Sequence, residues 1–233
     1  MEAGSALSAA LRLVVELDSG FLGIIGLSLR VTCSAVVLAA LVGMPLGALI
    51  ALSRFPGRSL VIVTINALMG LPPVVAGLAL FLVLSRSGPL GGLGWLFSPA
   101  AMIAAQTVLV LPIVIALTRQ VVEELWSEYR EHLTSLGLTG LRAIPTLLRD
   151  ARFSLVTALL AGFGRASAEV GAVLIVGGNI AGYTRTMTTA IALETSKGDL
   201  PLALGLGIVL LALTFAINAV AYGASRIGAR YAG

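Results

Sequence analysis

The chain has 233 residues, of which 58% are hydrophobic and 11% are charged, and its mean hydropathy is +1.03. An average soluble domain carries roughly 25% charged residues, so this composition excludes a water-soluble globular protein. Apolar runs of about 20 residues are typical of membrane-spanning helices, because the strands of a β-barrel are shorter and alternate in polarity. The net charge of +4 comes almost wholly from arginine. In a membrane protein such an excess indicates cytoplasmic anchoring rather than binding of nucleic acid.

The first 26 residues are predicted to form an interfacial helix and a lead-in to the first span. Residues 5–17 place leucine and valine at helical spacing, but they are too short and too charged to cross a bilayer, which favours an amphipathic helix. Glu2 precedes any basic residue, and this is not typical of a signal peptide. Cys33 is the only cysteine, so no disulfide within the chain and no thiolate metal site is expected. No bound cofactor is expected either.

Residues 27–224 are predicted to form one domain with five membrane-spanning helices. The expected spans are residues 27–52, 60–84, 99–118, 153–176 and 201–224. Pro72 and Pro73 fall within the second span and should break it, which is tolerated where the backbone lines a cavity or is buried in protein. The glycines of residues 43–47 should let a neighbouring helix approach the first span closely. A short helix is expected near residues 186–193.

The distribution of arginine predicts the orientation of these spans. Arginines occur in residues 53–58, in the long polar segment 119–152 and in the short tail 225–233, all on one side of the membrane. Basic loops remain in the cytoplasm, so the polar segment and the C-terminus are expected there, and the N-terminus outside.

The polar segment 119–152 is predicted to form two short helices. Gly137 is well placed to end the first helix, Thr139 to cap the second, and Pro145 to kink or restart it. Four residues of the first helix recur at helical spacing: Val122, Trp126, Tyr129 and Leu133. Two interpretations stay open, a cytoplasmic knob that docks a soluble partner and a solvated loop whose helices rest on the lipid headgroups.

At this segment the chain resembles a known family. Glu131 followed by Gly137 resembles the EAA loop of ABC-importer permeases, in which Glu-Ala-Ala precedes a glycine by three residues. His132 and Leu133 replace the two alanines, and residues 147–150 depart from the Ile-x-Leu-Pro that follows in the family. Residues 65–78 and 166–191 are similar to the second and penultimate spans of oxyanion-importer permeases. Residues 192–211 resemble the short tungstate-type members in particular.

The resemblance implies an all-α, type I (MetI-like) permease of a prokaryotic plasma (inner) membrane. It implies a homodimer embedded in lipid, with two cytoplasmic ABC ATPases on the loops and an extracytoplasmic binding protein that delivers tungstate or, as alternatives, molybdate or sulfate. The residues expected to contact the ATPase are Glu128, Arg130, Glu131, His132, Leu133, Thr134, Ser135, Leu136, Gly137, Leu138, Thr139 and Arg142.

The residues exclude ATP hydrolysis by this chain, independently of the resemblance. A P-loop needs Gly-Lys-Ser/Thr, whereas the only lysine, Lys197, lies in Ser-Lys-Gly. The chain is therefore expected not to be an enzyme, and any ATP would be used by a partner. A secondary transporter or channel is the competing class, although the sequence shows no inverted repeat and few intramembrane charges. A membrane assembly factor without transport activity is a third.

A few polar residues of the spans and outer loops are candidate sites. Arg165 and Glu169 are one helical turn apart near mid-bilayer, so they should pair, either to fix helix register or to line the passage. Asn66 is expected to bond between helices or, with Pro72 and Pro73, to touch the passage. Four residues of the outer loop could contact an oxyanion or a docked binding protein, or form an ordinary polar loop: Asn179, Thr184, Arg185 and Thr186.

Overall fold

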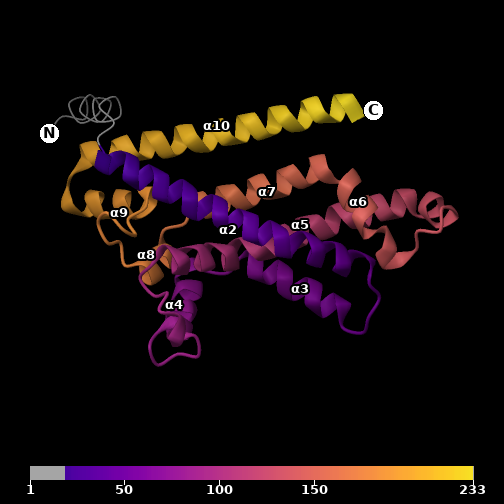
Figure 1. Ribbon diagram of the computed structural model, residues 1–233, viewed down its shortest axis with the longest axis horizontal. Helices are drawn as coiled ribbons and strands as arrows, with labels where there is room; N and C mark the ends of the chain where they lie inside the picture. Colours follow the sequence, from indigo (N-terminus) through magenta and orange to yellow (C-terminus); the bar gives the residue numbers. More distant parts are fainter. Residues whose placement is uncertain (1–18, 233) are drawn as a thin grey trace. The chain divides into compact units, whose positions relative to one another are not determined.

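The computed structural model describes the backbone of residues 19–232 and the side chains of residues 19–223 (Figure 1). The predicted amphipathic helix at residues 5–17 lies outside the described residues. Within them every regular element is a helix, as predicted. The elements are α2 (Ser19–Leu52), α3 (Arg58–Met69), α4 (Pro73–Leu84), η1 (Gly91–Leu93), α5 (Pro99–Ser135), η2 (Gly140–Ala143), α6 (Ile144–Asp150), α7 (Arg152–Ser167), α8 (Gly171–Gly177), α9 (Met187–Lys197) and α10 (Leu200–Ala232).

Three helices of the described chain are long and apolar enough to cross a membrane, namely α2, α5 and the Leu200–Gly223 part of α10. Two further helix pairs are apolar and long enough only when each pair is taken together. The helices α3 and α4 are bent by 103° at the break between them and α7 and α8 by 61°, as in a broken span or a re-entrant loop. Counting each bent pair as one span gives the predicted five. The chain is already helical in α2 ahead of the predicted residue 27, so Gly20 and Gly23 lie inside this helix.

The break between α3 and α4 lies at the double proline, as predicted. The N–H groups of Gly70 and Leu71 close the last turn of α3 on Ala67 and Leu68, both at 3.1 Å. Pro72 is extended, with φ −61° and ψ 126°, and Pro73 opens α4. A proline has no N–H to donate and disfavours a helical residue before it, so the two rings together end one helix and begin the next.

The described chain forms two compact units, of which the first contains Pro72–Gln106 and Gly164–Ile217 together with the start of α2. Here α4 and α8 pack so closely that a Cβ on Gly77 would lie 2.7 Å from the Ala172 Cα. A small core joins the starts of α2 and α10 to α9. It consists of Phe21, Met187, Ala190 and Leu206.

The second unit contains Val36–Leu71 and Thr107–Phe163. Its α2 and α5 segments touch at two glycines, as the sequence predicted. A Cβ on Gly43 would lie 2.9 Å from Val114 Cγ1, and one on Gly47 would lie 2.6 Å from the Ile115 carbonyl oxygen. Pro45 lies between these glycines without ending α2.

Candidate functional site

The polar segment begins as a direct extension of a membrane span. The sequence predicted a span ending near residue 118 and a separate helix after it, but α5 continues unbroken to Ser135. Gly137 ends this helix with φ +77°, as predicted. Its N–H donates to the Thr134 carbonyl at 3.0 Å and the Leu138 N–H donates to the Leu133 carbonyl at 2.9 Å, which is a Schellman motif.

The remainder of the segment folds back as η2 and α6. Thr139 is extended at the start of η2, but its side chain makes no capping hydrogen bond, contrary to the prediction. Pro145 lies in the first turn of α6 and so restarts the chain as a helix. This position suits proline because the first-turn N–H groups have no partner within the helix.

These elements enclose a core together with the end of α2, and we call this body the knob (residues 119–152; Figure 1). The buried members are Ala48, Val122, Leu133, Ala143 and Leu147, with Trp126 and Leu138 packed against them. Trp126 therefore contributes to the packing of this core, in agreement with its helical spacing from Val122 and Leu133. A loop with its own core is better described as a knob than as helices resting on headgroups.

The predicted contact residues divide into a buried and an exposed group. Leu133 is buried and Leu138 half-buried, whereas the other ten are exposed. Two exposed apolar side chains beside them, Tyr129 and Leu141, were missed, because helical spacing assigned Tyr129 to the core and gave no signal for Leu141. Leu136 is 65% exposed and Leu141 is 52% exposed. The Glu128 carboxylate accepts a hydrogen bond from Tyr129 and raises the pKa of this phenol, which stays neutral near pH 7.

Arg165 and Glu169 form the predicted ion pair but do not share one helix. Because α7 ends at Ser167, Glu169 lies in the break before α8. One carboxylate oxygen accepts from Arg165 Nη1 at 2.9 Å, and the other accepts from the Ala172 N–H at 2.9 Å in the first turn of α8. The Glu169 side chain is 1% exposed. This doubly bonded carboxylate favours a role in holding the break.

The other polar residues of the spans differ in their surroundings. Gln106 is buried, and its Nε2 donates to the Ala166 carbonyl at 3.0 Å, linking α5 to α7. Asn66 is exposed on α3, as is Pro72 at the break, whereas Pro73 is half-buried. No bond from Asn66 to another helix is seen in the described part of the chain.

The loop between α8 and α9 is stabilised by hydrogen bonds of its own threonines. Thr184 is fully buried, donates to the Gly177 carbonyl at 2.6 Å and accepts from the Ile180 N–H at 2.9 Å. Thr186 is also buried, and its N–H bonds to Thr189 Oγ1 at 3.0 Å where α9 begins. In this conformation both threonine side chains are therefore buried and bonded within the loop. Asn179 is half-buried, with φ +51°.

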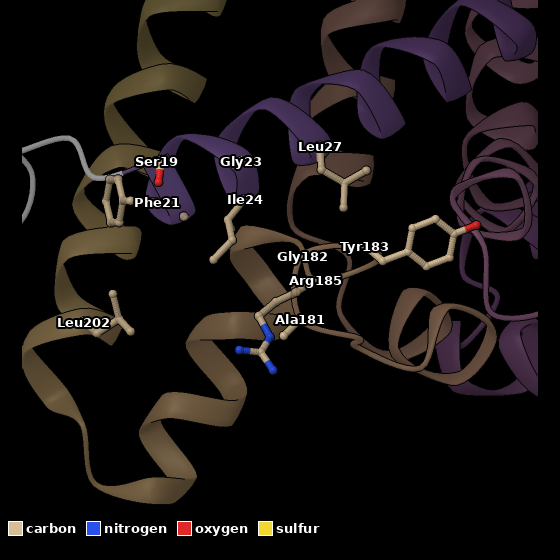
Figure 2. Close-up of a pocket in the computed structure, with 11 residues that line it drawn as sticks. Ser19, Phe21, Gly23, Ile24, Leu27, Ala181, Gly182, Tyr183, Arg185 and Leu202 are labelled. Carbon is tan, nitrogen blue, oxygen red and sulfur yellow. The ribbon is translucent and has the colours of Figure 1, made fainter.

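Arg185 lines a pocket of about 600 Å³ between the start of α2, this loop and Leu202 of α10 (Figure 2). Among the described residues that line it, Arg185 carries the only charge. Its Nη1 lies 3.8 Å from Glu194 Oε1, which Lys197 Nζ approaches to 3.0 Å. Two cations thus share one carboxylate, and the cluster keeps a net positive charge beside an otherwise uncharged pocket.

Comparison with known proteins gives one family. Residues 43–230 match the family described as the binding-protein-dependent transport system inner membrane component. The match covers most of the described chain, including both bent pairs and the whole knob.

Individual relatives align over most of their length. A probable anion ABC transporter permease protein of Haloferax volcanii is 44% identical over 84% of this chain and 87% of its own. A tungstate uptake system permease protein, TupB, of Peptoclostridium acidaminophilum is 42% identical over 92% of this chain and 94% of its own. The TupB of Campylobacter jejuni is 39% identical, over 68% of this chain and 66% of its own.

Proposed function

The chain belongs to the family of binding-protein-dependent transport system inner membrane components, and from this premise we propose that it forms the passage of an ATP-driven oxyanion importer. Membership confirms the resemblance to ABC-importer permeases and the predicted all-α, multi-pass fold of the inner membrane. A permease of this family is not itself an enzyme.

The observation that carries the proposal is the continuity of α5 from a membrane span into the knob. A single helix joins Pro99 to Ser135. The core of the knob packs against the last turns of this helix and against the end of α2. A force applied to the knob therefore acts directly on two membrane-spanning helices. Transport by alternating access needs such a link between a soluble motor and the passage.

The soluble motor in this proposal is a dimer of separate ABC ATPases. The 233 residues contain no Gly-Lys-Ser/Thr, so the energy has to come from another chain. The surface offered to it has exposed apolar side chains at Tyr129, Leu136 and Leu141, surrounded by exposed charged or polar residues. An apolar centre with a polar rim is the usual anatomy of a protein interface. The surrounding residues are Glu128, Arg130, Glu131, His132, Thr134, Ser135, Thr139 and Arg142.

The proposed substrate is tungstate, with molybdate and sulfate as alternatives. Two of the relatives above are named as tungstate uptake permeases. A binding protein outside the membrane would deliver the anion and set most of the specificity. The pocket beside Arg185 has the charge to receive an oxyanion, since the guanidinium offers donors in a planar fork and Glu194 neutralises it only in part.

The remaining parts of the proposal concern assembly and orientation. Two copies of the chain would enclose the passage, with the broken spans supplying backbone that lines it. The N-terminus would lie outside and the C-terminus in the cytoplasm, because the arginines of the knob and the tail favour that side. ATP would be bound by the partner alone, and this chain would need no cofactor.

Reconstitution with candidate partners tests the function. The chain would be co-expressed with an ABC ATPase and an oxyanion-binding protein and placed in lipid vesicles. We expect ATP-dependent uptake and ATP hydrolysis stimulated most strongly by tungstate, compared with molybdate and sulfate. Full uptake by this chain without an ATPase would establish a secondary transporter or channel instead. A complex that assembles but never transports would indicate an assembly factor.

A further inference from the structure

Arg58 joins three elements of the second unit where α3 begins. Its Nε donates to the Ile50 carbonyl at 2.9 Å, and its Nη2 approaches the Ala51 carbonyl at 3.4 Å. Both carbonyls belong to the last turn of α2, where they have no partner within the helix. A guanidinium there satisfies these acceptors and complements the negative end of the helix.

The same guanidinium also reaches α5. Arg58 Nη2 bonds to Glu123 Oε1, and the other carboxylate oxygen of Glu123 accepts from Arg119 Nη1 at 2.5 Å. Arg119 is well shielded, with 12% of its side chain exposed. Glu123 is also the neighbour of Val122, which belongs to the core of the knob. We call Arg58, Glu123 and Arg119 the Arg58 clamp.

The clamp lies beside a close backbone approach between α2 and α5. A Cβ on Gly47 would lie 3.1 Å from the Arg119 nitrogen as well as 2.6 Å from the Ile115 carbonyl, so no side chain there can act as a spacer. Between α2 and α3, residues 54–57 are all exposed, and the short turn they form gives α3 little support. The Arg58 side chain therefore links the start of α3 to both other helices.

We propose that the Arg58 clamp transmits the movement of the knob from α5 to α3, whose far end leads into the break at Pro72. The inference rests on the proposed function, and it adds a positioning residue that is not among the residues proposed to contact the ATPase or the anion. The planar fork of arginine is required because it serves two carbonyls and a carboxylate at once, whereas a lysine ammonium is a single point charge on a flexible stem.

The test measures oxyanion uptake per ATP hydrolysed in vesicles containing the full complex. We expect Arg58→Gln and Glu123→Gln each to lower this ratio by about fivefold or more, the lower end of ordinary coupling between sites, while the complex still assembles. The double variant should be no worse than either single variant, because both remove the same link. Arg54→Gln is the matched control, since Arg54 is exposed in the same turn and should keep the normal ratio.

The Arg58→Lys variant distinguishes the contacts of the clamp from the effect of a positive charge on the orientation of the chain in the membrane. Lysine keeps the positive charge that fixes topology but cannot make the three contacts, so a clearly lowered ratio in this variant supports the proposal. A normal ratio in Arg58→Lys, or in both glutamine variants, overturns it. If Arg58→Gln does not assemble, Arg58→Lys and Glu123→Gln decide. Wild-type complex that shows no ATP-coupled uptake counts against the proposed function itself, and the inference falls with it.

Discussion

Glu169 places one carboxylate oxygen on Arg165 and the other on the Ala172 N–H, and Thr188 Oγ1 donates to its backbone carbonyl at 2.8 Å. These contacts fix the end of α7, the start of α8 and the start of α9 to one residue. A divalent oxyanion would be repelled by this carboxylate. The geometry favours a structural role for the pair over a substrate site.

Removing only one member of this pair should therefore be worse than removing both. Glu169→Ala leaves the Arg165 guanidinium without its carboxylate, and breaking a shielded pair in this way costs on the order of 3 kcal/mol. Glu169→Ala combined with Arg165→Ala removes the uncompensated charge and should recover part of the loss. The fraction of folded protein in detergent, measured by size-exclusion chromatography after heating, provides the check. Equal losses in the two variants would count against pairing.

Gly137 is required because its backbone has a positive φ, and not because a side chain there would clash with a neighbour. Its φ of +77° costs an ordinary residue about 1–2 kcal/mol, while a Cβ there would meet nothing within 4 Å. We expect Gly137→Leu to disturb the turn between α5 and η2 and to uncouple ATP hydrolysis from uptake, with the spans intact. Gly137→Asn is the control, because asparagine tolerates this conformation. Normal uptake per ATP in the leucine variant would refute the role.

At the residue scale, local chemistry was predictable from sequence and partners distant in sequence were not. The end of α5 at Gly137 follows from glycine's access to positive φ, and the Arg165–Glu169 pair follows from their spacing. The clamp could not be predicted, because Arg58 and Glu123 are distant in sequence and nothing in the sequence pairs them. The same limit applies to Thr184, whose burial depends on how the loop between α8 and α9 folds.

The contact between α2 and α5 makes a prediction at the element scale. Gly47→Ala would place a methyl group 2.6 Å from the Ile115 carbonyl oxygen, so the two helices would have to separate. Overpacking of this kind usually costs about 1–3 kcal/mol, and we expect a lower thermal midpoint in detergent. Gly207→Ala in α10 is the matched control, because a Cβ there meets nothing within 4 Å. If both variants melt alike, the close approach is not important for stability.

The two broken spans differ in how visible they are in the sequence. Pro72 and Pro73 predict the break between α3 and α4, because proline has no N–H to donate and its ring clashes with the preceding turn of a helix. No proline marks the break between α7 and α8, where Glu169 caps the second helix, so a continuous span was predicted. The continuity of α5 was missed for a related reason: Arg119 and Gln120 are good helix formers, and polar composition alone does not end a helix.

At the scale of the whole molecule, the exposed surface matches a hydrocarbon environment. Leu211, Phe215 and Val220 of α10 are among the most exposed apolar side chains of the described residues. In water they would be an aggregation hazard, whereas in lipid they need no partner. Composition and the length of apolar runs predicted this class, because the thickness of the bilayer sets the length of a spanning helix. The number of apolar runs predicted five spans, which is the count obtained when each bent pair is taken as one span. Composition and the length of apolar runs do not predict how two copies would meet, because their contact depends on side-chain packing across the interface.

Orientation is the property of the whole molecule that charge predicts and that labelling can check. Ser135 at the end of α5 and Ser87 after α4 are both exposed, and the basic residues around the knob should keep the first in the cytoplasm and the second outside. Each would be replaced by cysteine in a Cys33→Ser background, because Cys33 is itself exposed. In right-side-out vesicles, an impermeant thiol reagent should label Ser87→Cys at once and Ser135→Cys only after the membrane is opened. The reverse pattern would place the knob outside, where no cytoplasmic ATPase could reach it, and the proposed coupling would have to be abandoned.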